Sequence, residues 1–265
     1  MNKVTVLIPT RNRPAALATT LTALAFQEFG DFSVFISDQS DIPVAADTVV
    51  LAAKRLLEHH NHPVVVRIHL PCRGVAEQRQ FLLDNSSSRY SLFLDDDVLL
   101  ESWALKGMVK AMERERCGFV GNAVIGLSFK DDFRPEEEAI EFWEEKVMPE
   151  KVRPQSKKWQ RHKLHNAANL LHVAAKFRLT HRRQKKYKVA WLGGCVLYDT
   201  DKLRKVGGFG FWKGLPKGYA GEDALVQIRL MERYGGCGLI PSGAYHQELP
   251  TTIPLRKVNA PDVFG

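Results

Sequence analysis

The 265-residue sequence lacks an uninterrupted apolar stretch long enough to cross a membrane as a helix. Its first residues, Met1-Asn2-Lys3, lead directly into the strand-like run Val4-Thr5-Val6. That beginning leaves no room for the apolar core of a secretory signal. We therefore expect a cytoplasmic protein, and attachment to the inner face of a membrane stays open.

Cysteine is scarce, and its four occurrences lie far apart without any CxxC pair. Zinc sites and disulfide frameworks need cysteines at short, regular spacings. The spacing therefore argues against both and predicts reduced, mostly buried thiols.

Acidic residues are absent from Lys151 to Lys188, a segment that carries thirteen Lys and Arg. The net charge of +8 comes from this segment, because elsewhere 25 basic residues meet 30 acidic ones. Directly before it, residues 131–150 hold nine acidic residues. Adjacent blocks of opposite charge suggest an insertion, which we place at residues 150–188.

A helical stripe inside the basic insertion supports two interpretations; its apolar members are Leu164, Ala167, Leu171, Ala174 and Phe177. A basic amphipathic helix is typical of binding to an anionic membrane surface. Alternatively, the helix packs on its own domain and leaves a solvated basic face. Nucleic-acid binding is a further hypothesis, which the small number of aromatic residues in the segment argues against.

Apolar strand patterns alternate four times with helical patterns in the first half of the chain. The expected strands are 4–9, 32–37, 64–70, 91–94 and 119–125, and the helices between them are 14–24, 43–58, 75–83 and 101–116. Such alternation predicts an α/β fold with a mainly parallel sheet that helices cover on both faces.

Three adjacent carboxylates, Asp95, Asp96 and Asp97, follow the apolar run Ser91-Leu92-Phe93-Leu94. Neighbouring carboxylates at a strand end repel one another, so a compensating cation is needed if they are buried. A divalent cation would suit them, and it could also hold a substrate phosphate. The alternative is a solvated acidic turn.

Four polar loops follow the expected strands, at 10–13, 38–41, 72–74 and 95–97. Ligands of open α/β sheets bind at the carboxyl ends of the strands, where one crevice could collect all four loops. Arg11, Arg13 and Arg73 suit phosphates, and the carboxylates suit a metal. The pattern predicts a nucleotide-diphosphate site.

The motifs, taken in order, resemble a family-2 glycosyltransferase of the GT-A fold. They are residues 6–13, Asp38, Arg73-Gly74 through Arg79, Asp95-Asp96-Asp97, Gly193-Gly194 and Gly221-Glu222-Asp223. The resemblance implies a single GT-A domain over residues 1–265. Residues 1–125 would bind the nucleotide, and residues 126–265, with the insertion, would bind the acceptor and hold the catalytic base.

The resemblance also implies a role for each matching residue. The nucleotide-sugar site would include Pro9, Thr10, Arg11, Arg13, Asp38, Arg73, Gly74, Arg79, Asp95, Asp96, Gly193 and Gly194. Mn²⁺ or Mg²⁺ would be held by Asp97, with Asp95 and His246. Asp223 would be the catalytic base, beside Glu222, and a helix start should lower its pKa.

The resemblance implies an inverting transfer from a nucleotide-sugar, usually a UDP-sugar, to a glycan or glycolipid acceptor. Two departures are visible: Gln80 stands where the family often has Asn, and no Gln-x-x-Arg-Trp motif of processive relatives follows Asp223. The second departure favours the addition of one sugar. A rival hypothesis is a nucleotidyltransferase, which should show a Gly-rich loop with a Lys near the first strand. That loop here is Thr10-Arg11-Asn12-Arg13.

Overall fold

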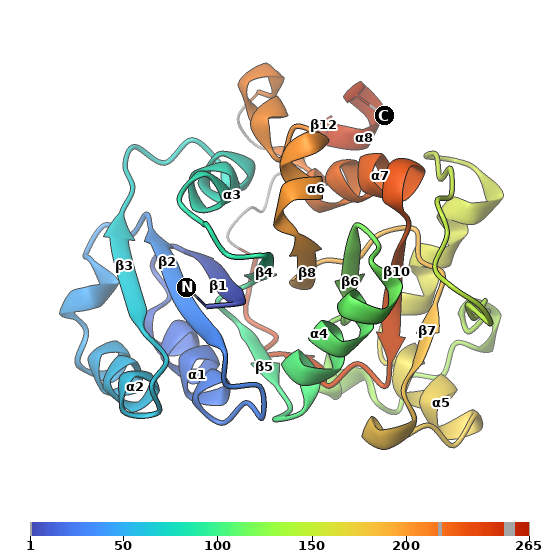
Figure 1. The fold of residues 1–265 in the computed structure, drawn as a ribbon, viewed down its shortest axis with the longest axis horizontal. Helices are drawn as coiled ribbons and strands as arrows, with labels where there is room; N and C mark the ends of the chain where they lie inside the picture. Colours follow the sequence, from blue (N-terminus) through green and yellow to red (C-terminus); the bar gives the residue numbers. More distant parts are fainter. Residues whose placement is uncertain (1, 217–218, 252–257, 265) are drawn as a thin grey trace.

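A computed structural model describes residues 2–216, 219–251 and 258–264. Within them the main sheet has the strand order β3-β2-β1-β4-β8-β6-β10-β7 (Figure 1). Only β8 and β7 run against their neighbours, so the sheet is mostly parallel. The strands are β1 Val4–Thr10, β2 Phe32–Asp38, β3 Val64–Ile68, β4 Tyr90–Leu94, β6 Phe119–Gly121, β7 Lys185–Tyr187, β8 Cys195–Asp199 and β10 Gly236–Ile240. The predicted fold class is confirmed.

Helices cover both faces of the sheet because its strands are apolar on both sides. In β1, Val4, Val6 and Ile8 join one buried cluster, while Leu7 joins the other. The first cluster lies against α1 Pro14–Ala25, α2 Thr48–His59 and α4 Ala104–Glu115; the second lies against α3 Val75–Asp84, α6 Thr200–Lys205 and α7 Glu222–Tyr234.

Local chemistry sets where these helices begin. Pro14 opens α1, where its missing N–H is not needed. Asp47 caps α2 by accepting from the backbone N–H groups of Val49 and Val50. The helix predicted from residue 43 therefore begins later, after a 3-10 turn at Val44–Ala46. Beside α7, the short strands β9 Tyr219–Ala220 and β12 Val258–Asn259 pair, and α8 Ala260–Phe264 follows.

The parallel register brings the ends of the central strands to one edge of the sheet. Thr10, which ends β1, pairs with Asp38, which ends β2, and β4 lies on the other side of β1. A separate ribbon of β5 Val98–Leu100 and β11 Ala244–His246 pairs His246 with Val98. The C-terminal half thereby delivers an imidazole beside the acidic loop.

The continuous helical stripe predicted for the basic insertion is wrong. A 3-10 helix, Lys157–His165, and the helix α5, Asn169–Lys176, replace it. Ala167 between them has φ 45°, which no right-handed helix allows. The apolar side chains of both helices still pack inward, since Leu164 and Val173 are both buried.

The acidic block before the insertion pairs with it and forms only a short turn, Pro135–Glu137. Arg161 contacts Glu141 at 2.8 Å and Glu150 at 2.6 Å, and Lys158 lies 3.0 Å from Glu150. The backbone of this block also bonds to the insertion, because the N–H of Lys188 donates to Glu141. Much of the insertion's positive charge is therefore neutralised within the chain.

Two further expectations concern membrane spans and thiols. No helix among the described residues is long and apolar enough to cross a membrane. The four cysteines are free thiols, of which Cys117, Cys195 and Cys237 are buried, as predicted.

Candidate functional site

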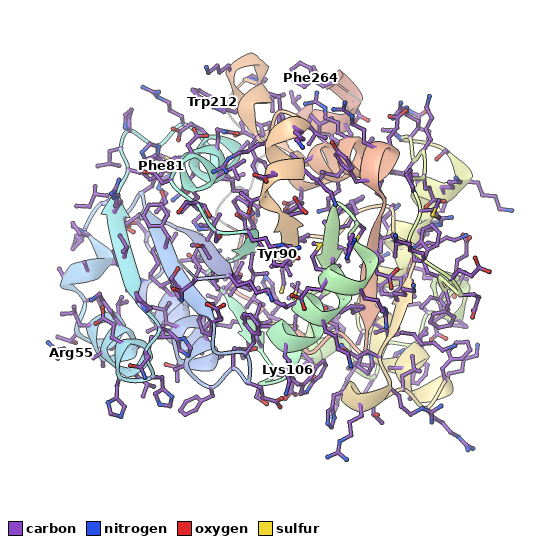
Figure 2. All side chains as sticks on the ribbon, viewed as in Figure 1. Arg55, Phe81, Tyr90, Lys106, Trp212 and Phe264 are labelled. Carbon is purple, nitrogen blue, oxygen red and sulfur yellow. The ribbon has the colours of Figure 1, made fainter. Side chains whose placement is uncertain are left out.

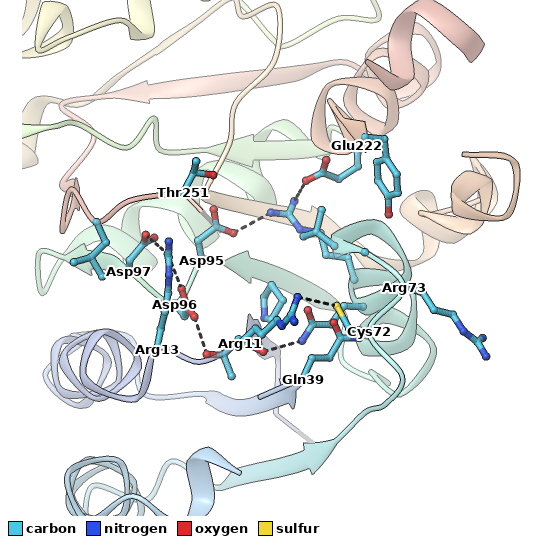
Figure 3. Close-up of a pocket in the computed structure, with 18 of the residues that line it drawn as sticks. Arg11, Arg13, Gln39, Cys72, Arg73, Asp95, Asp96, Asp97, Glu222 and Thr251 are labelled. Carbon is cyan, nitrogen blue, oxygen red and sulfur yellow. Dashed lines mark hydrogen bonds and ion pairs between the residues drawn. The ribbon is translucent and has the colours of Figure 1, made fainter. Parts of the chain in front are cut away.

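A cavity of about 490 Å³ lies at the carboxyl ends of β1, β2 and β4 (Figure 3). Its volume is in the range of pockets that hold small molecules. It is lined by Pro9, Thr10, Arg11, Arg13, Gln39, Cys72, Arg73, Gly74, Val75, Gln78, Arg79, Asp95, Asp96, Asp97, Tyr219, Glu222, His246, Leu249 and Thr251. Most residues that the sequence assigned to the nucleotide-sugar site are in this set. Asp38, Gly193, Gly194 and Asp223 are outside it.

The acidic loop is held by polar groups from β1 and the loop after it. Thr10 Oγ1 donates to Asp96 Oδ2 at 2.7 Å, and Arg13 donates to Asp97 Oδ2 at 2.7 Å. Arg13 also lies 3.5 Å from Asp96. The solvated acidic turn is therefore not what the structure shows, because Asp96 and Asp97 are both buried.

Burial and neighbouring charge disturb the ionisation of Asp96. Removal from water, and to a lesser extent Asp97 and Asp95, raises its pKa to about 7, against the opposing effects of Thr10 and Arg13. The loop and the adjacent Glu222 and Asp223 together hold five carboxylates, which contact only two arginines, Arg13 and Arg79, among the described residues. A bound cation would relieve this excess.

Asp97 and His246 are the pair best placed to hold such a cation. His246 Nε2 lies 3.4 Å from Asp97 Oδ2, so one ion could touch both. Among the described residues, no group of three or more His, Cys, Asp or Glu converges as a complete metal site. Two protein ligands fit a magnesium-type ion whose remaining ligands are phosphate oxygens and water.

Two contacts would change on metal binding. Arg13 occupies Asp97 Oδ2, and His246 Nδ1 accepts from the backbone N–H of Glu248 at 2.7 Å. An Nδ1 that accepts leaves the proton of a neutral imidazole on Nε2. Ligation through Nε2 therefore requires the other tautomer, and an ion at Asp97 Oδ2 would compete with Arg13 for that oxygen.

Arg79 joins the acidic loop to the start of α7. It donates to Asp95 Oδ1 at 2.9 Å and to Asp223 Oδ1, and it lies 3.9 Å from Glu222. Its side chain is only 4% exposed, and its pKa is held well above the ordinary value by these carboxylates despite burial. One guanidinium thus serves three carboxylates.

The pKa predicted for Asp223 from its helix position has the wrong direction. Burial, with Glu222 and Asp95 nearby, raises the pKa of Asp223 to about 7, although Arg79 acts to lower it. Desolvation outweighs the helix dipole, whose effect is small and falls off with solvent screening. A carboxyl with this pKa can exchange a proton near neutral pH.

The two glycines before β8 lie between the acidic loop and α7. The carbonyl of Gly194 accepts from the backbone N–H of Asp95 at 2.9 Å. Gly194 has φ +76°, and a Cβ on it would lie 2.8 Å from Val124. A Cβ on Gly193 would lie 4.0 Å from Asp223 Oδ2, the oxygen that Arg79 does not hold. Gly193 therefore leaves space in front of that oxygen.

The Asp38 carboxylate is occupied by hydrogen bonds within the turn that follows β2. Its two carboxylate oxygens accept from the backbone N–H groups of Ser40 and Val44 at 2.9 and 2.7 Å. The residue that lines the cavity there is Gln39. Contact of Asp38 with a base stays a prediction.

Several lining residues are absent from the site that the sequence predicts. The Tyr219 hydroxyl accepts from the backbone N–H of Ala76 and would lie 2.8 Å from a Cβ on Gly74, so a glycine is needed there. Gln78 donates to the carbonyls of Thr10 and Ser37. Nothing at the sequence level separates Gln78 from any other polar residue of a helix.

The arginines differ in direction. Arg11 points into the cavity and donates to Cys72 Sγ at 3.6 Å (Figure 3). Arg73 is directed away from the carboxylates, with its guanidinium 6.0 Å from the ring of Trp212 (Figure 3).

A family model described as "Glycosyl transferase family 2" matches residues 5–184. The match covers more than half of the chain and includes the acidic loop, and it ends before α7. No curated protein matches this sequence.

Solved structures of similar fold agree with the family match. Residues 1–349 of S. aureus TarS match with a TM-score of 0.60 and 17% identity, covering 92% of this chain and 60% of that one. The same fragment in complex with UDP-GlcNAc matches with a TM-score of 0.60 and 16% identity, covering 95% of this chain and 60% of that one.

The mannosyltransferase PcManGT from Pyrobaculum calidifontis, in complex with GDP-Man and Mn²⁺, has a TM-score of 0.58 and 16% identity, with coverage of 95% and 59%. The chain thus spans about 60% of the length of these three structures. At these identities, the likeness establishes the fold, which is GT-A.

Proposed function

This chain belongs to glycosyl transferase family 2, and from this premise we propose that it moves one sugar from a nucleotide-sugar donor to an acceptor hydroxyl with inversion. The expected donor is a UDP-sugar, and the expected acceptor is a glycan or glycolipid. The observation that carries the proposal is the 490 Å³ cavity, whose lining brings together Arg11, Arg13 and three adjacent carboxylates. Residues 1–125 would bind the nucleotide, and residues 126–265 would bind the acceptor.

Donor binding would use the charge arrangement of the cavity. Arg11 and Arg13 suit the diphosphate, and Asp97 with His246 would hold Mn²⁺ or Mg²⁺, with Asp95 near the same ion. When bound, the ion would neutralise the leaving diphosphate. Release of Arg13 from Asp97 would free its guanidinium for a phosphate oxygen.

The base would be Asp223, acting through Oδ2. Arg79 holds Oδ1 and so fixes the orientation of the carboxylate, while Gly193 leaves room at Oδ2. The acceptor oxygen would attack the anomeric carbon as Asp223 takes its proton, and the bond to the nucleoside diphosphate would break. Displacement from the opposite face inverts the configuration. Glu222 is the rival base, because it lines the cavity directly.

Donor class can be tested by thermal unfolding with a panel of uridine and guanosine nucleotide-sugars, with and without Mn²⁺. We expect a UDP-sugar to raise the Tm only when Mn²⁺ is present, because binding to the native state stabilises it by mass action. At 100 times the Kd, the stabilisation is about 2.7 kcal/mol. A rise with guanosine donors alone would reassign the nucleotide, and no rise with any donor would contradict the proposal.

Gly193→Ala should fold normally and impair transfer. The added Cβ would meet only ordinary contacts, 3.7 Å from Trp191 and 4.0 Å from Asp223 Oδ2, yet it would occupy the space proposed for the acceptor hydroxyl. We expect a raised KM for the acceptor, with donor affinity and Tm unchanged.

Gly194→Ala is the contrasting variant of this pair. Its positive φ and the 2.8 Å approach to Val124 should lower the Tm. Unchanged acceptor kinetics in Gly193→Ala would show that the acceptor hydroxyl does not bind beside Gly193.

A further inference from the structure

A second hollow, also about 490 Å³, lies between α4 and the segment that begins at His181. Lys106 on its rim and Trp212, the ring that Arg73 covers, lie at opposite ends of the molecule (Figure 2). The hollow is lined by Glu28, Trp103, Lys106, Gly107, Lys110, Ala111, Arg114, His181, Arg182, Gln184, Lys186 and Leu239. None of these residues lines the donor cavity.

Cations dominate the walls of this hollow. Lys106, Lys110 and Arg114 follow one another at four-residue spacing, so they share one face of α4. Like charges at this spacing repel and destabilise a helix. Arg182 and Lys186 bring two further cations from the opposite wall. Concentrating five cations here costs stability unless an anion compensates.

The acidic residues nearby compensate only part of this charge. Lys106 lies 3.0 Å from Glu28, while Arg114 and Lys186 share Glu115 at 2.7 and 2.8 Å. Within residues 2–216, 219–251 and 258–264, Lys110 and Arg182 have no acidic partner within 4.0 Å. Five cations therefore meet two carboxylates, and the hollow keeps a surplus of positive charge.

An aromatic pair and a glycine of α4 also line the hollow. Trp103 and His181 stack with their centroids 5.9 Å apart and their planes at 29°. Gly107 has no side chain between Lys106 and Lys110, which lets Gln184 approach the helix. A Cβ there would lie 3.3 Å from the amide carbon of Gln184. The Gln184 amide nitrogen donates to the carbonyl of Pro241 at 2.9 Å, which fixes that side chain.

We propose that this hollow binds a phosphate-bearing ligand, a phosphomonoester or phosphodiester, at a site separate from the donor cavity. Phosphate oxygens accept several charge-assisted hydrogen bonds, which Lys110 and Arg182 are free to donate. The Trp103–His181 pair offers an apolar surface for the rest of the ligand. The proposal goes beyond glycosyl transfer and does not depend on it.

Arg182 and Lys186 are the two Lys or Arg residues of the basic insertion that line the hollow. Six of the insertion's thirteen cations have acidic partners, namely Lys151, Arg153, Lys158, Arg161, Lys186 and Lys188. Arg182 is one of the seven that have none among the described residues, and it lines the hollow together with the unpaired Lys110 of α4. The shared chemistry is phosphate, and its source is either a dissolved molecule or a lipid headgroup.

The test uses the full chain, with the donor cavity saturated by UDP and diamagnetic Mg²⁺ and with inorganic phosphate as the probe. Amide NMR signals of Gly107 and the indole signal of Trp103 should shift and saturate. In the Lys110→Gln/Arg182→Gln variant, phosphate affinity should fall roughly tenfold, since two charge-assisted bonds are lost. The matched control is Lys176→Gln/Arg183→Gln, which removes two cations of the chain outside the hollow and should keep the wild-type affinity.

Vesicles distinguish the two sources of phosphate. A lipid headgroup is supported if the protein binds phosphatidylglycerol vesicles but not phosphatidylcholine vesicles. This binding should fall in Lys110→Gln/Arg182→Gln and not in the control variant. Phosphate binding without vesicle binding supports a dissolved ligand. Equal losses in both variants would show a diffuse basic face and overturn the proposal, as would absent shifts at Gly107 and Trp103. Thermal unfolding controls for folding, because removing a charge from the row on α4 should not lower the Tm.

Discussion

Asp223→Asn should lower kcat by about two to four orders of magnitude, the usual contribution of general-base catalysis. Asparagine keeps the shape and a hydrogen bond to Arg79 and loses the basicity of Oδ2. Donor affinity should change little, because Asp223 lies outside the donor cavity. Steady-state transfer kinetics, together with donor titration, separate the two effects.

Glu222→Gln is the matched control, since the two carboxylates are adjacent and both lie near Arg79. It should cost less than Asp223→Asn. An inactive Glu222→Gln beside an active Asp223→Asn would move the base to Glu222. Full activity in both variants would contradict the assignment of a catalytic base to this pair of carboxylates.

The pH dependence of the wild-type protein gives the same prediction an independent readout. A base must be ionised, and burial raises the pKa of Asp223 from 3.8 to about 7. The kcat should therefore fall as the pH drops through about 7 and be fully present above it. A base with an ordinary pKa would keep kcat nearly constant down to about pH 5.

Asp97→Asn should abolish metal-dependent donor binding and nearly abolish transfer. Asp97 is the buried carboxylate of the acidic loop that lies beside His246, and loss of even an outer-shell partner of a metal costs about 10- to 100-fold in affinity. We expect Mn²⁺ affinity, measured by the free-ion paramagnetic resonance signal with UDP present, to fall by at least roughly 100-fold. Asp41→Asn, a carboxylate bonded to Asn12 outside the cavity, is the control.

An alternative explanation of this loss must be separated. Arg13 pairs with Asp97 at 2.7 Å, so Asp97→Asn also releases Arg13. If that release caused the loss, Arg13→Gln would reproduce it. In our account, Arg13→Gln keeps or strengthens Mn²⁺ binding without nucleotide, since a competing cation is gone. Unchanged Mn²⁺ affinity in Asp97→Asn would remove Asp97 from the metal site.

The sequence predicts the parallel half of the sheet well, because its signal is local. Buried strands such as Val4–Thr10 and Tyr90–Leu94 are short apolar runs with polar residues at both ends. Strand ends at one edge of a parallel sheet must gather the loops that follow them. Thr10, Arg13 and Asp97 could therefore be assigned to one crevice before any coordinates.

Prediction from the sequence is wrong where contacts between distant segments determine the structure. The helix pattern over residues 164–177 breaks at Ala167, whose φ of 45° the apolar spacing does not reveal. The pKa of Asp223 depends on burial beside Arg79 and Asp95, which are 144 and 128 positions away along the chain. Its position at a helix start, taken alone, predicts a lowered pKa. His246 is assigned beside Asp97 only through the resemblance to the family, because their contact depends on a ribbon between distant segments.

The most direct measurement follows the donor's sugar and phosphorus atoms by NMR, with diamagnetic Mg²⁺ and an alcohol or the natural acceptor. Glycosyl transfer breaks the bond between the anomeric carbon and the phosphate oxygen. Our account therefore predicts release of the nucleoside diphosphate and a first product of inverted anomeric configuration, both lost in Asp223→Asn. Release of a nucleoside monophosphate would instead show cleavage at phosphorus, as in a nucleotidyltransferase. That result, or a product of retained configuration, would contradict the account.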